Sequence, residues 1–254
     1  MYITQIGQGR VAQSGESFHL TVPPVSRDAY HNAQISSYLT PRYFYHRPPL
    51  RMSVRAYGEG EIHGTAGFGF WNHPYVPAER RFRLLKQIRL LKQFRLPKAC
   101  WFFYGSPPNN LQLAKGVPSY GWKAATFDAT GWRLFALLPA APLGFLLMRI
   151  PSLYNRLWPV GQRAIGVSEH LLDSSLLQES HEYEIEWRVE GVTFAVDGQT
   201  VHESQLSPRG PLGFIAWVDN QYAIVTPQGR FGFGLVDVPQ PQMLVLESLQ
   251  IEGD

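Results

Sequence analysis

Apolar and polar residues alternate through much of this chain, which is the pattern of β-strands with one buried face. The pattern is clearest in the segment HEYEIEWRVEGVTFAVDG, residues 181–198. Glu190-Gly191 and Asp197-Gly198 are turn dipeptides, so the segment predicts a β-hairpin followed by a second turn. One face of its first strand carries His181, Tyr183, Ile185, Trp187 and Val189, and the other carries Glu182, Glu184, Glu186 and Arg188.

The same reasoning predicts strands along most of the remaining chain. They cover residues 15–23, 30–38, 49–58, 64–72, 101–110, 211–219, 221–227, 229–236 and 242–252. The alternation of the last strand slips near Ser248, which predicts a β-bulge there. A content of 23 Gly, 20 Pro and 13% aromatic residues fits many short strands joined by turns, so we expect an all-β fold.

Two segments interrupt the strands. Residues 80–98, RRFRLLKQIRLLKQFRLPK, repeat a short motif of strong helix formers. They predict a basic, partly helical insertion at about 74–98, which either covers the sheet as a solvated helix or contacts a membrane. Residues 132–178 are apolar and interrupted by prolines, and we expect loops and one or two helices over one end of the sandwich. A length of 254 residues is compatible with one domain carrying both insertions.

Three segments carry a resemblance to a known family. The order H-x-Y-x-x-x-W then V-x-F-x-V-D-G in 181–198, GTAGFGFW at 64–71 and PRGPLGFIAWVDNQ at 208–221 resemble concanavalin A-like jelly rolls. The likeness is greatest to laminarinase-type family 16 glycoside hydrolases and touches about half of the chain. It implies a jelly-roll β-sandwich whose concave sheet binds the ligand, with tryptophans that stack on sugar rings or other flat apolar faces.

The resemblance does not extend to the catalytic segment of that family. Its members retain configuration through two carboxylates in an E-x-D-x-x-E or E-x-D-x-E motif, which lies between the G-x-W strand and the H-x-Y-x-x-x-W strand. Residues 98–110, KACWFFYGSPPNN, occupy this position and contain no carboxylate. Glu182, Glu184 and Glu186 have a similar spacing but lie in a different strand, where such spacing is typical of a solvated face. The sequence therefore does not support the family's hydrolysis.

The strand at 211–219 indicates where a ligand would bind. Phe214, Ala216 and Val218 suit the core, so Trp217 and Asp219 point the other way. An aromatic, an acid and an amide that face outward together are typical of a lined cleft. The alternatives are that each tryptophan belongs to the core and that residues 219–221 form a polar turn. The candidate ligand-binding residues are Trp71, Trp101, Trp217, Asn220, Gln221 and Arg230, and the candidate general acids or bases are Asp219 and His73.

Other chemistry is sparsely represented. The single cysteine, Cys100, excludes an internal disulfide, and the first residues lack the basic start and apolar stretch of a secretory signal, so we expect a cytoplasmic protein. The eight histidines show no paired metal-ligand spacing, and no nucleotide-binding fingerprint occurs. We therefore expect neither a metal nor a cofactor.

Charge is unevenly distributed. Residues 80–168 hold 14 Lys or Arg and one acid, Asp128, whereas the remaining chain holds 9 Lys or Arg and 19 acids. Either the two parts pack together and neutralise each other, or the basic part meets an anionic partner.

We predict a module that binds a small molecule or carbohydrate in the concave groove. The alternative is a cyclase, isomerase or hydrolase that uses Asp219 or His73 on an apolar substrate. A third reading is a membrane-peripheral protein that contacts an anionic surface through 80–98. Nucleic acid is not an expected partner.

Overall fold

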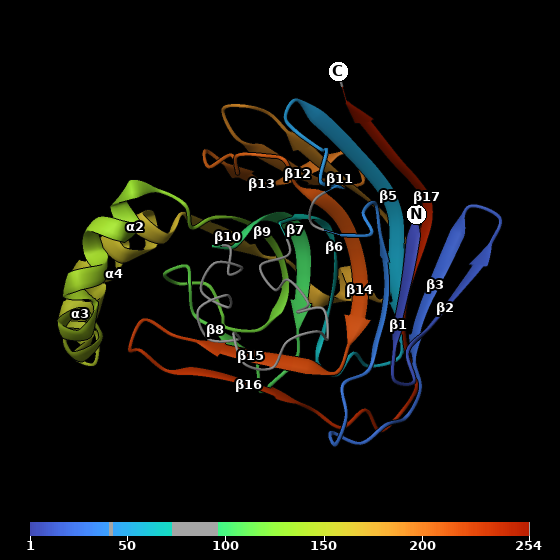
Figure 1. Ribbon diagram of the computed structural model, residues 1–254, viewed down its shortest axis with the longest axis horizontal. Helices are drawn as coiled ribbons and strands as arrows, with labels where there is room; N and C mark the ends of the chain where they lie inside the picture. Colours follow the sequence, from blue (N-terminus) through green and yellow to red (C-terminus); the bar gives the residue numbers. More distant parts are fainter. Residues whose placement is uncertain (41–42, 73–95, 254) are drawn as a thin grey trace, which may run out of the picture.

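A computed structural model describes residues 1–40, 43–72 and 96–253. Two seven-stranded antiparallel sheets pack face to face, and a three-stranded sheet lies on the far side of one of them (Figure 1). The sheet between the other two is called the inner sheet, and its large partner the outer sheet. This arrangement is a β-sandwich of jelly-roll type, as the alternation and the resemblance predicted.

Both large sheets join strands that are far apart in the sequence. The inner sheet has the order β1 (Tyr2–Ile6), β4 (Asn32–Ser36), β14 (Gly213–Asp219), β6 (Thr65–Trp71), β7 (Lys98–Gly105), β9 (Gly121–Asp128) and β10 (Val167–Leu171). The outer sheet has the order β13 (Gln199–Ser204), β12 (Val192–Val196), β11 (His181–Trp187), β5 (Leu50–Glu59), β17 (Gln242–Gly253), β3 (Ser17–Val22) and β2 (Arg10–Ser14).

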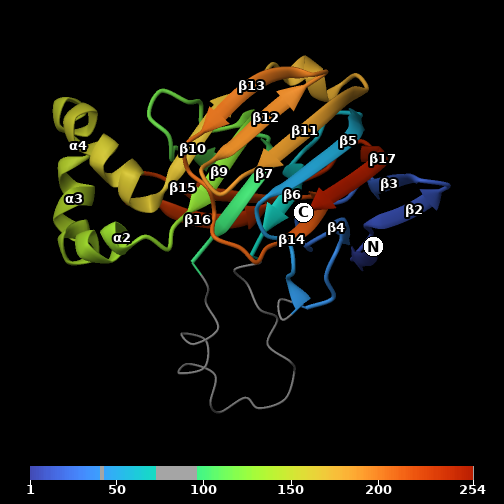
Figure 2. The same cartoon turned by 90° about the horizontal axis from the view of Figure 1, so that it is seen from above.

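The remaining elements are the three-stranded sheet and the helices. The three-stranded sheet consists of β16 (Phe231–Leu235), β15 (Gln221–Val225) and β8 (Asn110–Leu111). The helices of the described residues are α2 (Trp132–Leu137), η2 (Leu138–Ala140), α3 (Ala141–Leu147), α4 (Pro151–Ile165) and η3 (Ser174–Leu177). Figure 2 shows α2, α3 and α4 standing out from one end of the strands.

The core lies between the two large sheets and follows the predicted alternation. Phe68 and Phe70 of β6 and Phe214 of β14 are fully buried there, opposite Tyr183 and Trp187 of the outer sheet. Phe68 meets Tyr183 edge to face with ring centroids 5.2 Å apart. The predicted alternation therefore matches the buried faces of these strands, except that Val189 lies beyond the end of β11 and is exposed.

Two further predictions are confirmed in part. The register of β17 against β5 shifts between Glu247 and Gln250, and Ser248 has a φ of 51°, which is the bulge expected at that residue. The segment 132–178 contains helices, but its second half also contributes β10, which extends the inner sheet and was not predicted. Residues 73–95, which include most of the basic insertion, lie outside the described residues.

Candidate functional site

The inner sheet has a second face, turned away from the core, which is called the groove face. Register places Trp217 opposite Gly67, Gly67 opposite Phe103 and Phe103 opposite Lys123 across four neighbouring strands. The side chains at these positions point away from the sandwich core, because Phe68, Phe102 and Ala216 point into it. The three-stranded sheet lies on this side of the inner sheet (Figure 1).

Four aromatic side chains gather on the groove face and are called the aromatic platform. Trp71 and Trp217 stack nearly parallel, with centroids 6.4 Å apart and planes inclined by 11°. Trp101 lies 5.3 Å from Trp217 and 6.0 Å from Trp71, and Phe103 lies 5.7 Å from Trp101. The structure thus brings together the three tryptophans predicted for the site and adds Phe103, which the alternation of the WFFYG segment places beside Trp101.

Two glycines of β6 make room for the platform. A Cβ atom at Gly67 would lie 3.0 Å from the Trp217 ring and 2.3 Å from the carbonyl oxygen of Phe102. Gly69 has a φ of 146°, and a Cβ there would lie 2.7 Å from Cβ of Trp101. The Trp217 ring lies over the bare backbone of Gly67, and Gly69 leaves room for Cα and Cβ of Trp101, which explains glycines on one side of this strand.

One polar atom of the platform is unsatisfied. The indole Nε1 of Trp101 is buried and has no hydrogen-bond partner among the described residues. A buried donor without an acceptor costs roughly 1–3 kcal/mol, so such groups are uncommon in folded proteins. An acceptor atom on a bound molecule could satisfy it. By contrast, Nε1 of Trp217 donates to Oγ1 of Thr65 at 3.0 Å.

Asp219 follows Trp217 on the same face and is buried under a set of donors. Its Oδ1 accepts from the hydroxyl of Thr65 at 2.7 Å and from the backbone N–H of Gln221 at 3.1 Å. Its Oδ2 accepts from the hydroxyl of Tyr30 at 3.0 Å. Burial raises the pKa of Asp219 from 3.8 to about 6, although these hydrogen bonds favour the carboxylate.

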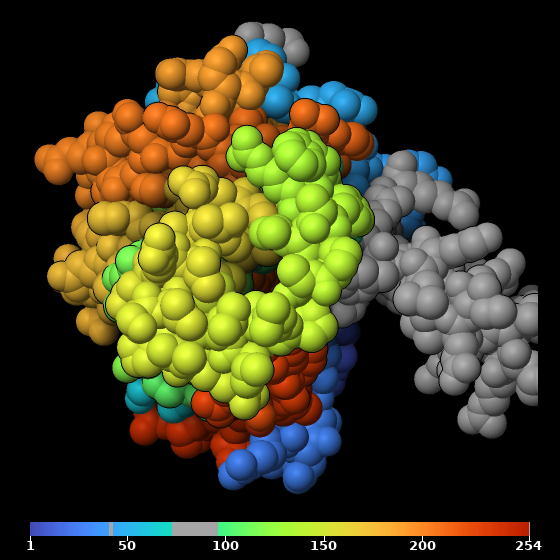
Figure 3. All heavy atoms as spheres, turned by 90° about the vertical axis from the view of Figure 1, so that its left-hand side faces the viewer, coloured from blue at the N-terminus to red at the C-terminus, as the bar shows by residue number. Residues whose placement is uncertain are grey.

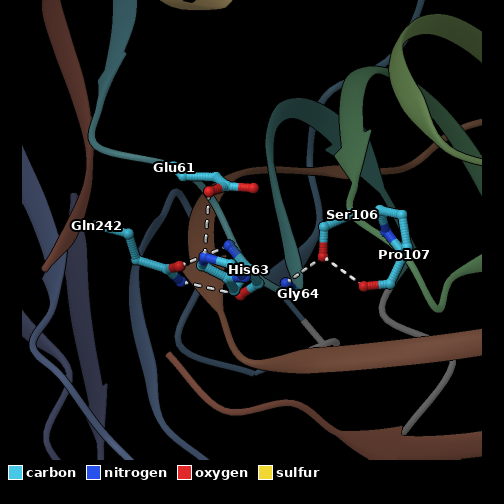
Figure 4. A network of polar contacts seen from close by, with 6 residues as sticks. All are labelled: Glu61, His63, Gly64, Ser106, Pro107 and Gln242. Carbon is cyan, nitrogen blue, oxygen red and sulfur yellow. Dashed lines mark hydrogen bonds and ion pairs between the residues drawn. The ribbon is translucent and has the colours of Figure 1, made fainter. Parts of the chain in front are cut away.

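A second set of contacts holds the loop before β6 in place. Gln242 of β17 accepts from the backbone N–H of His63 at 2.7 Å and donates to the carbonyl oxygen of Asp219 at 3.3 Å. The backbone N–H of Gly64 donates to the hydroxyl of Ser106 at 2.8 Å (Figure 4). These contacts fix the residue that follows, Thr65, beside Asp219.

The raised pKa of Asp219 leads to a testable prediction. In the folded state Asp219 binds a proton up to a higher pH than in the unfolded state, so its contribution to stability falls as pH rises from about 4 to about 6. Asp219→Asn removes this titration. We expect the free energy of unfolding of the variant to rise relative to wild type by up to roughly 3 kcal/mol between pH 4 and pH 7, measured by urea unfolding.

Asp197→Asn is the matched control for that experiment. The backbone N–H of Glu182 and the ring of His181 lower the pKa of Asp197, so its contribution is present at neutral pH and is lost as pH falls. The free energy of unfolding of Asp197→Asn, relative to wild type, should therefore fall between pH 4 and pH 7. A pH-independent difference for Asp219→Asn would contradict the raised pKa.

The other side of the groove face holds a buried ion pair that the sequence did not indicate. Lys123 of β9 and Glu169 of β10 lie 3.5 Å apart, Nζ to Oε2, with side chains 2% and 3% exposed. Burial lowers the pKa of Lys123 and raises that of Glu169, while each charge opposes the shift of the other. Glu169 also accepts a backbone hydrogen bond from Ala114. The segment that follows β8 therefore covers this part of the face.

Two predicted site residues, Asn220 and Arg230, are not part of the aromatic platform. Asn220 is fully buried; it accepts from the N–H of His31 and donates to the carbonyl oxygens of Ala29 and Val236. Backbone groups thus occupy the side chain of Asn220, as in the polar turn that was the alternative to a ligand contact. Arg230 is exposed in the turn between β15 and β16, away from the aromatic platform. His73 lies outside the described residues.

Gln221 has an intermediate position. It begins β15 directly after the turn, is half-buried, and donates its backbone N–H to Asp219. It therefore lies at the edge where the inner sheet meets the three-stranded sheet.

The two carboxylates on the described part of the groove face do not form a pair. Asp219 and Glu169 are the acids on the described part of the groove face, and their strands are separated by β6, β7 and β9. Four strand spacings correspond to about 19 Å, against the 5–5.5 Å that a retaining glycosidase needs. Glu184 lies on the solvent side of the outer sheet, where it pairs with Arg51 at 2.9 Å.

Comparison with known proteins identifies no family. No family model matches the chain, and no curated protein does. Similar solved structures include an endo-acting O-glycanase of the human gut microbiota that initiates mucin breakdown. It has a TM-score of 0.48 and 11% identity, with 98% of this chain and 84% of that chain covered.

Two further similar structures are glucanase-related. The Bacillus licheniformis β-glucanase has a TM-score of 0.43 and 9% identity, covering 96% of this chain and 82% of its own. A pseudo β-1,3-glucanase of Mycobacterium tuberculosis has a TM-score of 0.42 and 9% identity, covering 94% and 78%. The strand order given above is that of a jelly-roll β-sandwich.

Proposed function

We propose that this protein binds a small ligand with a flat apolar face, either a sugar ring or another planar molecule, on the aromatic platform. The observation that carries the proposal is the gathering of Trp71, Trp101, Phe103 and Trp217 on a face that takes no part in the sandwich core. The buried, unsatisfied Nε1 of Trp101 supports a ligand that also presents an acceptor oxygen. Aromatic faces with a few polar groups are typical of such sites.

The proposal includes the absence of family 16 hydrolysis. The positions of β7 that face the groove carry Ala99, Trp101 and Phe103 where the family has carboxylates. We expect no release of reducing sugar from laminarin, lichenan, agarose or carrageenan above background. Release that disappears in Glu184→Gln would contradict this and would assign catalysis to the outer sheet.

Trp101→Ala tests the platform directly. Wild-type protein and the variant are titrated by calorimetry with laminarihexaose, a lichenan-derived oligosaccharide, a mucin O-glycan and a planar aromatic probe. We expect at least one of these to bind, and the variant to lose roughly tenfold or more in affinity, because stacking on an aromatic ring contributes on the order of 1 kcal/mol beyond the area that it buries.

Two controls accompany this test. Trp132→Ala removes a tryptophan that is 75% exposed on α2, away from the platform, and should bind as wild type does. Trp101→Phe keeps a ring but removes the Nε1 donor, so it separates stacking from hydrogen bonding. Equal affinity of Trp101→Ala and wild type for every probe that binds would remove the platform as the site.

Asp219 favours a second candidate function. A carboxyl with a pKa of about 6 can exchange protons near neutral pH, as a general acid or base must. In this reading a ligand on the platform is converted beside Asp219 by a cyclase, isomerase or hydrolase reaction. Turnover of a bound ligand that Asp219→Asn abolishes, with affinity retained, would favour the enzyme over the binding module.

A further inference from the structure

The helices at one end of the molecule are apolar and yet poorly covered. Neither α2 nor α3 contains a buried residue. Monomeric proteins rarely expose many large apolar side chains in one region, because contact of apolar surface with water is unfavourable. Their exposed large apolar residues, with exposed fractions, are Trp132 (75%), Phe135 (54%), Leu137 (37%), Leu138 (53%), Leu143 (59%), Leu146 (58%) and Ile150 (49%).

The tip of the β15–β16 hairpin continues this surface. Phe145 of α3 meets Phe231 of β16 edge to face, with centroids 5.7 Å apart. Phe231 and Phe233 are each 61% exposed. Figure 3 views the molecule from this side, where α2, α3 and α4 occupy the centre of the face. The exposed residues of α2, η2, α3 and β16, with Ile150, are together called the apolar end.

Most charged groups around the apolar end are basic. Residues 129–168 contain Arg133, Arg149, Arg156 and Arg163 and no acid, and all four arginines are exposed. A cleft of about 790 Å³ beside Trp132 is lined by Arg133 and Arg163, among other residues. Its other charged lining residues are Asp128, Glu190 and Arg209.

We propose that the apolar end inserts into the surface of an anionic lipid bilayer. Apolar and aromatic side chains would enter the boundary between headgroups and acyl chains, while the arginines contact lipid phosphates and the cleft beside Trp132 receives a headgroup. No helix in the described ranges is long and apolar enough to cross a membrane, so insertion is confined to one leaflet. This proposal does not depend on the ligand of the aromatic platform.

Charge favours lipid over a second copy of the chain. A symmetric dimer through the apolar end would bring the same four arginines of each copy together, and like charges at an interface are unfavourable. The acids that line the cleft, Asp128 and Glu190, are fewer than these arginines. The surface also differs from the basic segment 80–98, most of which lies outside the described residues. The experiment therefore has to distinguish lipid binding through the apolar end, a dimer through the apolar end, and lipid binding through residues 80–98.

The test is flotation of the whole protein with phosphatidylcholine vesicles, with and without phosphatidylglycerol, at low and high salt. We expect flotation with the anionic vesicles, weakened by salt. Arg133→Gln, Arg149→Gln and Arg156→Gln combined should lower partitioning about a hundredfold, because each basic residue near an anionic surface contributes roughly fivefold. Leu143→Ser with Leu146→Ser should lower it by roughly tenfold or more.

Further variants and the melting temperature make the outcome decisive. The side chains changed in the arginine and leucine variants are exposed, so these two variants should melt within a few degrees of wild type. A matched variant with Arg83, Lys86, Arg89 and Lys92 changed to Gln should still float. Absence of flotation of the wild-type protein at low salt would overturn the proposal. The proposal would also be overturned if the variant at Arg83, Lys86, Arg89 and Lys92 no longer floated while the leucine variant floated as wild type does. A dimer in solution that the leucine variant dissociates, without flotation, would assign the apolar end to a second copy.

Discussion

Trp217→Ala is expected to lower the free energy of unfolding by about 3–5 kcal/mol. Although Trp217 points away from the sandwich core, it is only 7% exposed. Its ring lies on Gly67 and against Trp71 and Trp101, and its Nε1 donates to Thr65. Truncation leaves a cavity above Gly67, which has no side chain that could fill it. The melting temperature should fall by on the order of 10 °C.

The sequence offered two alternatives for Trp217, a ligand-binding residue of the groove or a residue of the core, and the structure matches neither completely. A groove residue would be half exposed and a core residue would face the opposite sheet, but Trp217 is a buried member of the groove face. Trp132→Ala is the control, because an exposed tryptophan should change stability by about 0.5 kcal/mol at most. If both variants melt together with wild type, Trp217 is not packed as described.

Because Trp217→Ala is expected to weaken the fold itself, loss of binding in this variant would not locate the site. Trp101 and Trp71 are half-buried and are better positions for that purpose.

Lys123→Met is expected to destabilise the protein by about 3–5 kcal/mol at neutral pH, because it leaves the carboxylate of Glu169 buried without a counter-charge. The pKa of Glu169, already raised by burial, would rise further in the variant. Its folded-state pKa would then lie well above the unfolded value. The stability of the variant should therefore fall as pH rises from about 4.5 through that raised pKa, and should be partly restored by acid.

Urea unfolding at pH 5 and pH 8 measures this difference. The matched control is the double variant Lys123→Met with Glu169→Met, which replaces the pair by apolar side chains and should recover most of the stability at both pH values. Equal stability of Lys123→Met and wild type at pH 8 would show that the ion pair does not contribute. The same result would follow if water reached Glu169 in the folded protein.

The sequence by itself determined which residues of the predicted strands face the core. Side chains alternate strictly along a strand, so Phe214, Ala216 and Val218 on one face place Trp217 and Asp219 on the other without knowledge of any neighbour. The bulge at Ser248 was visible for the same reason, because an extra residue shifts the alternation. The local sequence pattern was sufficient to predict features that depend on a single strand, such as its buried face and its bulge.

The sequence left some strands unrecognised. Strand β9, GWKAATFD, has a lysine and two alanines, which are poor strand formers, between its aromatic residues, and β10 follows directly after a helix. Lys123 would ordinarily indicate a solvated face, yet it lies buried opposite Glu169. A buried charge is compatible with folding only when its partner is present, and that partner is 46 residues away in the chain.

Only the tertiary structure decided which side chains lie beside one another on the groove face. The order of strands in the inner sheet sets Trp71 beside Trp217, and the same order separates Asp219 from Glu169 by four strand spacings. It also turned Asn220 inward, where backbone groups of distant segments use its side chain. Alternation along a strand is a local property, whereas strand order and burial depend on contacts between segments far apart in the sequence.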